Sequence, residues 1–214
     1  YMTTEVTVIR HGETEWNAVG RIQGHQDSFL NARGQLQTKA VADRLDGSLV
    51  DAFYSSDLTR TLQTAEPIAT AMGVSVISDS RLREWKLGVL ESLVLDEAAN
   101  SQPEAFRIYQ ERDPEAVVPG GESIRQRFDR ATSCLKEIIS QHQDGKVVVV
   151  THGGIIDDLY RYAKGIDLRA DRNWPLYNCG INRLKIDNWK WTVEIWGDIG
   201  HLGEIGSMAD WEKN

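Results

Sequence analysis

The chain has 214 residues, which is enough for one large domain or two small ones. Its hydrophobic share of 41% and charged share of 26% are those of an ordinary globular protein that can bury its own core. The formal net charge of −8 argues against nucleic-acid and anionic-membrane partners, because both would require a basic face. An anionic substrate would therefore need cations gathered locally.

The two cysteines, Cys134 and Cys179, do not have the spacing of a zinc site. We expect both to be free thiols in a reducing compartment. The N-terminal residues do not read as a secretory leader, and no apolar run approaches the length of a membrane span. These features predict a cytoplasmic protein with no membrane partner.

Strands and helices alternate along the first part of the chain. The expected elements are a strand at 5–10, a short helix starting near Gly12, a helix at 30–45, a strand at 50–56, a helix at 57–73 that Pro67 bends, and a strand at 74–78. Residues 80–119 are less regular, with short helical pieces such as 104–110.

The alternation resumes after residue 119. We expect a helix within 120–142, with Ser123 and Gln126 forming a capping box at its start. Residues 146–151 are apolar without alternation, which is typical of a central strand covered on both faces. A helix follows from Gly154, and the tail holds two strands, 181–187 and 191–197, that can form a hairpin through Asn188.

This order of elements predicts an α/β fold. We expect a three-layer sandwich in which a mostly parallel sheet has helices on both faces and an antiparallel strand or hairpin at one edge. Residues 2–214 then form a single domain, and 80–119 is an insertion that covers one end of it.

The ends of the predicted strands carry the residues that indicate chemistry. Arg10 and His11 end the first strand, His152 ends the strand at 146–151, and Arg60 falls in the first turn of the helix after the strand at 50–56. Ligands bind outside the carboxyl ends of strands in such a sheet. If the strands are neighbours, these four side chains meet at one edge.

Together these residue types are suited to phosphoryl chemistry. The forked donors of Arg10 and Arg60 match phosphate oxygens, and a neutral imidazole nitrogen is a competent nucleophile towards phosphorus. The glycines that follow each histidine, Gly12 and Gly153, let the backbone come close and supply amides. Each residue alone is weak evidence for a site. The group favours a common site because all four residues lie near the ends of predicted strands.

These residues lie in segments that resemble the histidine phosphatase superfamily, which is also called phosphoglycerate mutase-like. The matching segments are RHGETEWN, YSSDLTRTLQTA, RLRE, PGGES and VVVVTHGG, in the family's order and within residues 6–155. The tail WTVEIWGDIGHL is similar to that of plant and bacterial members named phosphoglycerate mutase-like.

The resemblance implies a role for each matching residue. His11 would be the nucleophile that becomes phosphorylated, while Arg10, Arg60 and His152 would hold the phosphoryl group. Glu84 would protonate the leaving oxygen and then activate water.

The same resemblance implies that Asn17 and Gln23 line the phosphate pocket, and we add the Gly153 amide to that set. It also implies the three-layer fold. Because the arginines beside the histidines would repel a cation, we expect no metal, and we expect no cofactor.

Two departures from the family concern the covering segment. Where the family often reads Gly-x-Trp-Glu-Gly after the acid, this chain keeps Gly88 and Glu91 but has Leu90 and Ser92. Cofactor-dependent mutases carry a longer insertion with adjacent arginines for the substrate's second anion. Residues 85–119 have no such pair and an excess of acidic residues, so we expect this cover to repel a second anion.

The sequence therefore predicts a metal-independent phosphomonoesterase that hydrolyses a small phosphorylated metabolite through a phosphohistidine. The alternatives are a cofactor-dependent phosphoglycerate mutase, an inactive module that binds phosphorylated ligands and, least favoured, a metallohydrolase using both histidines. We expect Trp85 and Trp174 to pack in the core. The sequence leaves open the identity of the substrate and the oligomeric state, a homodimer included.

Overall fold

The computed structural model describes residues 3–207, and within this range six strands form one sheet in the order β3-β2-β4-β1-β5-β6. The strands are β1 (Thr3–Arg10), β2 (Ala52–Ser55), β3 (Val76–Ser78), β4 (Lys146–Thr151), β5 (Ile181–Asp187) and β6 (Lys190–Asp198). Because β4 lies between β1 and β2, the ends of these three strands are brought to one edge of the sheet.

The sheet is mostly parallel with an antiparallel edge, as the sequence predicts. Strands β3, β2, β4 and β1 are mutually parallel, whereas β5 is antiparallel to both β1 and β6. The two-residue turn between β5 and β6 has positive φ at Asn188 (49°) and Trp189 (66°). Positive φ at both central residues is typical of the type I′ turn that joins tight hairpins.

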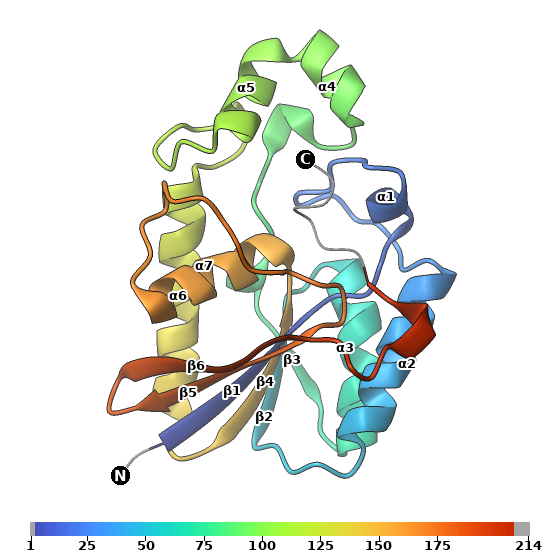
Figure 1. Ribbon diagram of the computed structural model, residues 1–214, viewed down its shortest axis with the longest axis vertical. Coiled ribbons are helices and arrows are strands. Elements are labelled where there is room, and N and C mark those ends of the chain that lie inside the picture. The colour runs from blue at the N-terminus through green and yellow to red at the C-terminus, as the bar shows by residue number, and fades with distance from the viewer. Residues whose placement is uncertain (1–2, 208–214) are drawn as a thin grey trace.

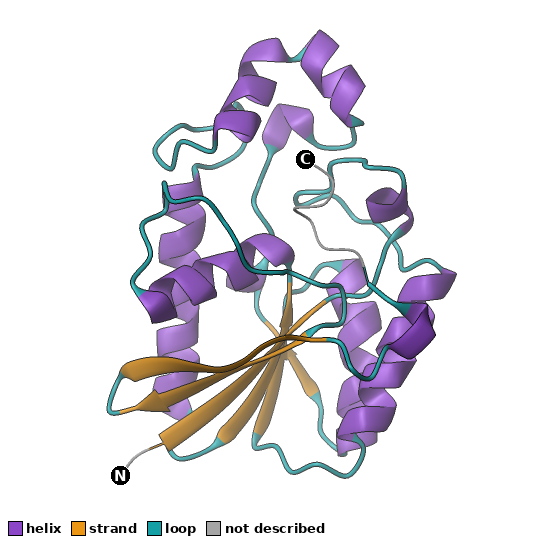
Figure 2. Cartoon of the chain, viewed as in Figure 1, coloured by secondary structure: helices purple, strands orange, loops and turns teal. Residues whose placement is uncertain are grey.

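Helices cover both faces of the sheet (Figures 1 and 2). Helices α2 (Ala32–Leu45) and α3 (Thr59–Met72) pack on one face, and α6 (Ile124–Gln141) and α7 (Gly153–Lys164) on the other. Successive strand residues point to opposite faces, so Val8 packs with α6 and α7 while Ile9 packs with α2 and α3. The predicted three-layer sandwich is confirmed.

Local capping explains several helix boundaries. Ser123 is the N-cap of α6, where its hydroxyl accepts from the Gln126 amide and the Gln126 side chain accepts from the Ser123 amide, which confirms the predicted capping box. Helix α3 runs through Pro67 and ends at Gly73, whose φ of 73° is easily adopted only by glycine. Helix α1 (Glu15–Ala18) is a single turn.

Residues 80–119 contain the short helices η1 (Ser80–Leu82), η2 (Gly88–Leu90), α4 (Leu95–Ser101) and α5 (Pro103–Glu111). Leu82 of η1 packs in the main core, whereas α4 and α5 lie at the top of the view in Figure 1, beyond the carboxyl ends of the parallel strands. The predicted helical piece at 104–110 lies within α5, whereas the sequence analysis missed α4. This segment has its own apolar cluster, in which Trp85, Leu90 and Val118 pack with Ile22 and Ile124.

A last short helix, η3 (Gly203–Ile205), follows the hairpin. Among the described helices, none is both long enough and apolar enough to cross a membrane.

Candidate active site

His11 follows directly on β1 and is held by its backbone and its ring. Its amide donates to the Thr151 carbonyl at 3.0 Å, and its side chain is buried. The ring Nδ1 lies 2.8 Å from the Gly12 carbonyl oxygen. A carbonyl oxygen can only accept, so Nδ1 carries the proton and Nε2 carries the lone pair. The strand end thus presents a histidine in the tautomer that can act as a nucleophile.

The surroundings of His11 also keep its ring neutral. Burial is the main cause that lowers the pKa of His11 well below 6.5, and the charges of Arg60 and Arg10 lower it further. The Gly12 hydrogen bond acts in the opposite direction and is outweighed. At neutral pH the Nε2 lone pair is therefore available.

Two guanidinium groups flank this histidine, and backbone carbonyls fix their positions. Arg10 Nη1 donates to the Leu176 carbonyl at 2.6 Å. Arg60, near the start of α3, donates to the carbonyls of Gln26 at 2.8 Å and Gly24 at 2.7 Å. Burial lowers the pKa of Arg60 to about 10, so it keeps its charge at neutral pH.

His152, at the end of β4, lies directly behind His11. The two ring centroids are 5.3 Å apart, with planes at 63°. His152 is fully buried, and its Nε2 is 2.8 Å from the Ser56 hydroxyl, whereas its Nδ1 is buried and has no hydrogen-bond partner among the described residues. Burial, together with the charge of Arg60, lowers the pKa of His152 well below 6.5. The neutral ring packs beside the His11 ring and does not line the cavity itself.

Glu84 is held in place through both its carboxylate and its backbone. The carboxylate accepts from the Trp85 amide at 2.7 Å and from the Gly154 amide at 3.0 Å. Its backbone carbonyl accepts from His25 Nε2 and from Arg130 Nη2, each at 2.7 Å. A Cβ on Gly154 would lie 2.2 Å from a Glu84 carboxylate oxygen, so a larger residue at this position would displace the Glu84 carboxylate.

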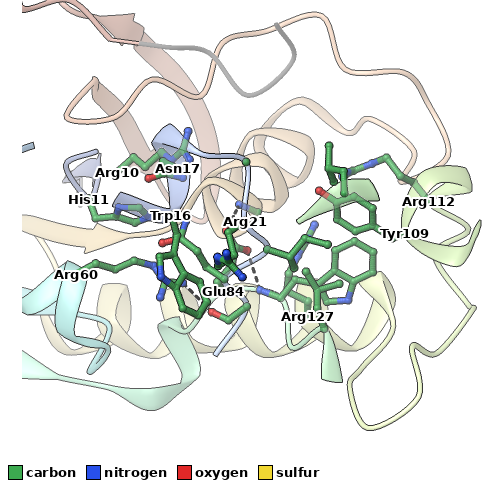
Figure 3. A pocket seen from close by; sticks show the side chains of 18 of the residues that line it. Arg10, His11, Trp16, Asn17, Arg21, Arg60, Glu84, Tyr109, Arg112 and Arg127 are labelled. Atoms are coloured by element: carbon green, nitrogen blue, oxygen red, sulfur yellow. Dashed lines mark hydrogen bonds between the residues drawn. The ribbon is translucent and has the colours of Figure 1, made fainter. Parts of the chain in front are cut away.

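A cavity of about 190 Å³ connects these groups (Figure 3). Arg10, His11 and Arg60 lie together at one end of the view, and Glu84 lies nearer its middle. The remaining residues predicted from the resemblance differ in their placement: Asn17 and Gln23 line the cavity, but Gly153 does not, and Gly154 takes that place.

Local hydrogen bonds orient the two predicted amide side chains. Asn17 caps α1 reciprocally with Thr14, whose amide donates to Asn17 Oδ1 at 3.1 Å. The Gln23 Oε1 accepts from the hydroxyls of Thr14 and Ser28, which turns the Gln23 amide nitrogen to the opposite side.

The sequence analysis missed several residues that line the cavity, among them Trp16, Tyr109 and four arginines: Arg21, Arg112, Arg127 and Arg172. Arginine in a helix or loop is usually solvated, so no local signal distinguishes these side chains. The nearest sequence signal was the PGGES segment (119–123), which resembles the family and ends one helical turn before Arg127.

The expectation that an acidic cover repels a second anion is wrong for the inside of the cavity. Among the described lining residues, Glu84 is the single carboxylate, and none of the acidic residues of 85–119 reaches the wall. Glu91, for example, accepts from the amides of His25 at 3.0 Å and Leu87 at 2.9 Å. The cover turns its acidic side chains to solvent or to structural partners, and it turns Arg112 inward.

The two tryptophans that were expected to pack do so, although one also lines the cavity. Trp174 is buried, donates to Asp157 at 3.0 Å and stacks on Tyr160 with ring centroids 4.3 Å apart. Trp85 is buried, donates to the Glu122 carbonyl at 2.8 Å and contributes to the cavity wall.

The arrangement supports phosphoryl transfer to a histidine. It combines a neutral imidazole, two fixed guanidinium groups and a carboxylate around one cavity. Within residues 3–207, no three histidine, cysteine, aspartate or glutamate side chains gather in a way that could hold a metal ion. Arginine side chains stand in the positions that would bind the phosphoryl oxygens.

Sequence comparison places the chain in a family that fits this site. Residues 6–199 match the histidine phosphatase superfamily (branch 1), and the chain belongs to this family. The relatives include phosphoglycerate mutase-like protein 4 of Arabidopsis thaliana, which is 40% identical over 208 residues, covering 95% of this chain and 89% of that protein.

Two further relatives carry different activities in their names. The metal-independent phosphoserine phosphatase of Arabidopsis thaliana is 38% identical over 208 residues, covering 96% of this chain and 86% of that protein. The probable phosphoglycerate mutase GpmB of Proteus mirabilis is 38% identical over 207 residues, covering 94% of this chain and 96% of that protein.

Solved structures share the fold over nearly the whole chain. YhfR of Bacillus stearothermophilus has a TM-score of 0.86 at 30% identity, covering 93% of this chain and 99% of that one. A mycobacterial glucosyl-3-phosphoglycerate phosphatase has a TM-score of 0.78 at 26% identity, covering 91% of this chain and 99% of that one.

Proposed function

We propose that this protein is a metal-independent phosphomonoesterase that hydrolyses a small phosphate ester through a phosphohistidine on His11. The observation that carries the proposal is the Nδ1 hydrogen bond to the Gly12 carbonyl, which leaves a neutral Nε2 beside Arg10 and Arg60. The family and the phosphatases among its relatives and structural neighbours support the same reaction.

In the first step, His11 Nε2 attacks phosphorus and the bond from phosphorus to the alcohol oxygen breaks. Arg10 and Arg60 stabilise the charge on the transferring phosphoryl oxygens, and Glu84 gives a proton to the leaving oxygen. In the second step, Glu84 takes a proton from water, the water oxygen attacks phosphorus and the bond to Nε2 breaks. The products are the alcohol and inorganic phosphate.

The roles of the remaining predicted residues belong to the same proposal. His152 supports the His11 ring from behind and, because its buried side chain does not line the cavity, we assign the phosphoryl oxygens to Arg10 and Arg60. Asn17 and Gln23 contribute amides from the cavity wall. We also propose that residues 2–214 form one domain with 80–119 as its cover, and that the protein works in the cytoplasm, where buried free thiols such as Cys134 and Cys179 stay reduced.

A phosphoglycerate mutase is the second candidate, because GpmB relatives carry that name and because cations line the cavity beyond the phosphoryl end. A mutase would use the same phosphohistidine but would exclude water from it. The active-site residues alone do not separate the two reactions.

The test is to supply 3-phosphoglycerate with catalytic 2,3-bisphosphoglycerate and to measure phosphate and 2-phosphoglycerate together. We expect phosphate release to exceed isomerisation by far, and a His11→Asn variant to lack both activities. Isomerisation that outruns phosphate release by orders of magnitude would identify the enzyme as a mutase.

A further inference from the structure

His25 lies in the loop between α1 and α2, is half-buried and does not line the cavity. Its ring Nε2 is 2.7 Å from the backbone carbonyl oxygen of Glu84. A carbonyl oxygen can only accept, so Nε2 carries the proton. Burial lowers the pKa of His25 below 6.5 and outweighs the Glu84 hydrogen bond, which raises it. A neutral side chain outside the cavity therefore donates to the backbone of the residue that we assign as the general acid.

The residues on either side of His25 hold Arg60. The Gly24 carbonyl accepts from Arg60 Nη2 at 2.7 Å, and the Gln26 carbonyl accepts from Arg60 Nη1 at 2.8 Å. The two donors of one guanidinium group thus bracket His25. Residues 24–26, which we call the 24–26 segment, contact Arg60 through their backbone and Glu84 through the His25 ring.

The cover fixes the 24–26 segment in turn. Glu91 accepts from the His25 amide at 3.0 Å and from Gln26 Nε2 at 3.1 Å, each through a different carboxylate oxygen. A Cβ on Gly24 would lie 2.3 Å from Glu91 Oε1, which shows how closely this carboxylate packs on the segment. A shift of the 24–26 segment would break these contacts, so the segment is a firm support for the His25 ring.

Glu84 depends on such support because residues 83–87 belong to no helix or strand. Its backbone has no ladder of hydrogen bonds, and its carbonyl is held by two side chains, His25 and Arg130, each at 2.7 Å. A displacement of about 1 Å in a group near the chemistry can cost about 10²-fold in rate. The anchors of the Glu84 backbone therefore bear on how well its carboxylate can reach a leaving oxygen.

We propose that His25 is a positioning residue, which ties the Glu84 backbone to the same segment that holds Arg60. The acid and the arginine that binds the phosphoryl group then keep a fixed separation during the reaction. This inference rests on the proposed phosphatase function. Loss of the His25 donor loosens Glu84 but leaves its carbonyl with the Arg130 hydrogen bond, so the folded chain keeps no unpaired oxygen there.

The experiment measures how strongly the reaction depends on protonation of the leaving oxygen. Phenyl phosphate and p-nitrophenyl phosphate are similar in shape, but phenolate is the poorer leaving group and needs the acid more. The readout is kcat/KM for phenyl phosphate divided by kcat/KM for p-nitrophenyl phosphate. This ratio does not include the later hydrolysis of the phosphohistidine, which both esters share.

We expect His25→Leu to lower this ratio about tenfold, between the factor for one hydrogen bond and that for a misplacement of about 1 Å. His25→Gln is the rescue variant, because a glutamine amide nitrogen can donate from nearly the same place as the imidazole Nε2. It should restore most of the wild-type ratio.

His142→Leu is the matched control. His142 is also half-buried, and its Nε2 is 2.9 Å from the Tyr54 hydroxyl. It follows the last residue of α6, whose 18 residues place it about 27 Å from the start of that helix beside the site. This control should keep the wild-type ratio.

A double variant tests whether His25 acts through Glu84. In a Glu84→Gln background, His25→Leu should leave the ratio unchanged, because both substitutions remove the same contribution. A further fall of the ratio in that background would show that His25 does not act through the acid and would overturn the proposal.

The outcomes separate this inference from the proposed function. Equal losses on the two esters in His25→Leu, or a ratio that His25→Gln leaves as low as His25→Leu does, overturn the positioning role, while phosphate release still supports the phosphatase. Circular dichroism verifies folding, and His25→Met, which also lacks the donor, replaces His25→Leu if that variant does not fold. Failure of the wild type to release phosphate from either ester, together with no acid-labile phosphoenzyme, overturns the proposed function itself.

Discussion

At His11, one hydrogen bond decides which ring nitrogen can react. The Gly12 carbonyl holds the proton on Nδ1, and the surrounding burial and arginine charges keep the ring neutral. In the role that we propose for it, a histidine in this state needs no separate base to remove a proton before it attacks.

We therefore expect His11→Asn to abolish both turnover and the phosphoenzyme, because no other group beside the two arginines can form the phosphorus–nitrogen bond. The measurement is to quench the enzyme with a labelled phosphate ester in alkali and to count the phosphate that acid then releases from the protein. A variant that traps wild-type amounts of acid-labile phosphate would rule out His11 as the nucleophile.

The contribution of Glu84 as a general acid should depend on how much protonation the leaving oxygen needs. We expect Glu84→Gln to lose about 10²- to 10⁴-fold in kcat on an alkyl phosphate, the usual range for general acid catalysis. The loss should be much smaller on p-nitrophenyl phosphate, whose leaving oxygen needs little protonation. Equal losses on the two substrates would contradict the acid role, although water activation by Glu84 would remain open.

Among the secondary-structure elements, α6 and α7 are joined by a buried ion pair beside the site. Arg127 of α6 and Asp158 of α7 form a two-pronged pair, and their side chains are 2% and 0% exposed. The same arginine lines the cavity, so this contact also holds one wall of the site in place.

Asp158→Ala should lower the free energy of unfolding by about 3–5 kcal/mol, because it leaves a buried guanidinium without its partner. Urea denaturation measures the change. The control is Glu111→Ala, which removes the exposed Arg107–Glu111 pair of α5 and should cost less than about 1 kcal/mol. Similar costs for the two variants would show that Arg127 finds a replacement partner or water.

For the whole molecule, the buried histidines link folding to pH. The pKa values of His11 and His152 lie well below 6.5 in the folded protein, so near and below that pH the unfolded chain binds protons that the folded protein does not. The two histidines contribute fully to the free energy of unfolding at pH values above their unfolded pKa of 6.5. This contribution decreases as the pH falls from 6.5 toward their lower pKa values in the folded protein.

We expect the free energy of unfolding to decrease by about 1.4 kcal/mol per pH unit for each such histidine as the pH falls below its unfolded pKa. The double variant His11→Asn with His152→Asn should show a flatter pH dependence than the wild type. Denaturant titrations at pH 7.5, 6 and 5 compare the two proteins. Parallel curves would mean that the two rings titrate alike in the folded and unfolded states.

The proposed reaction should survive removal of divalent metal ions, because it assigns the phosphoryl oxygens to Arg10 and Arg60 and not to a metal ion. Exhaustive EDTA treatment followed by a phosphate-release assay is expected to give full activity. Loss of activity that zinc or magnesium restores would support a metallohydrolase instead.

The sequence alone determined the layers of the fold and which residues lie where the parallel strands end. The spacing of apolar residues and the capping residues are local signals in the sequence. The helix capped by Ser123 and the alternation of strands and helices could therefore be predicted without tertiary contacts. His11 and Arg60 could be found because they sit at element ends that the fold class brings to one edge. The short helix α4 was missed, because seven residues give too little periodicity.

Only the tertiary structure decided the sign of the charge within the cavity. Net charge along the cover is acidic, yet the direction of each side chain depends on packing between segments far apart in the chain. Arg112, Arg127 and Arg172 meet because α5, α6 and the loop after α7 converge there, and no sequence pattern links them. The partner of His152, Ser56, was hidden for the same reason, because a contact across 96 residues is set by the order of strands in the sheet.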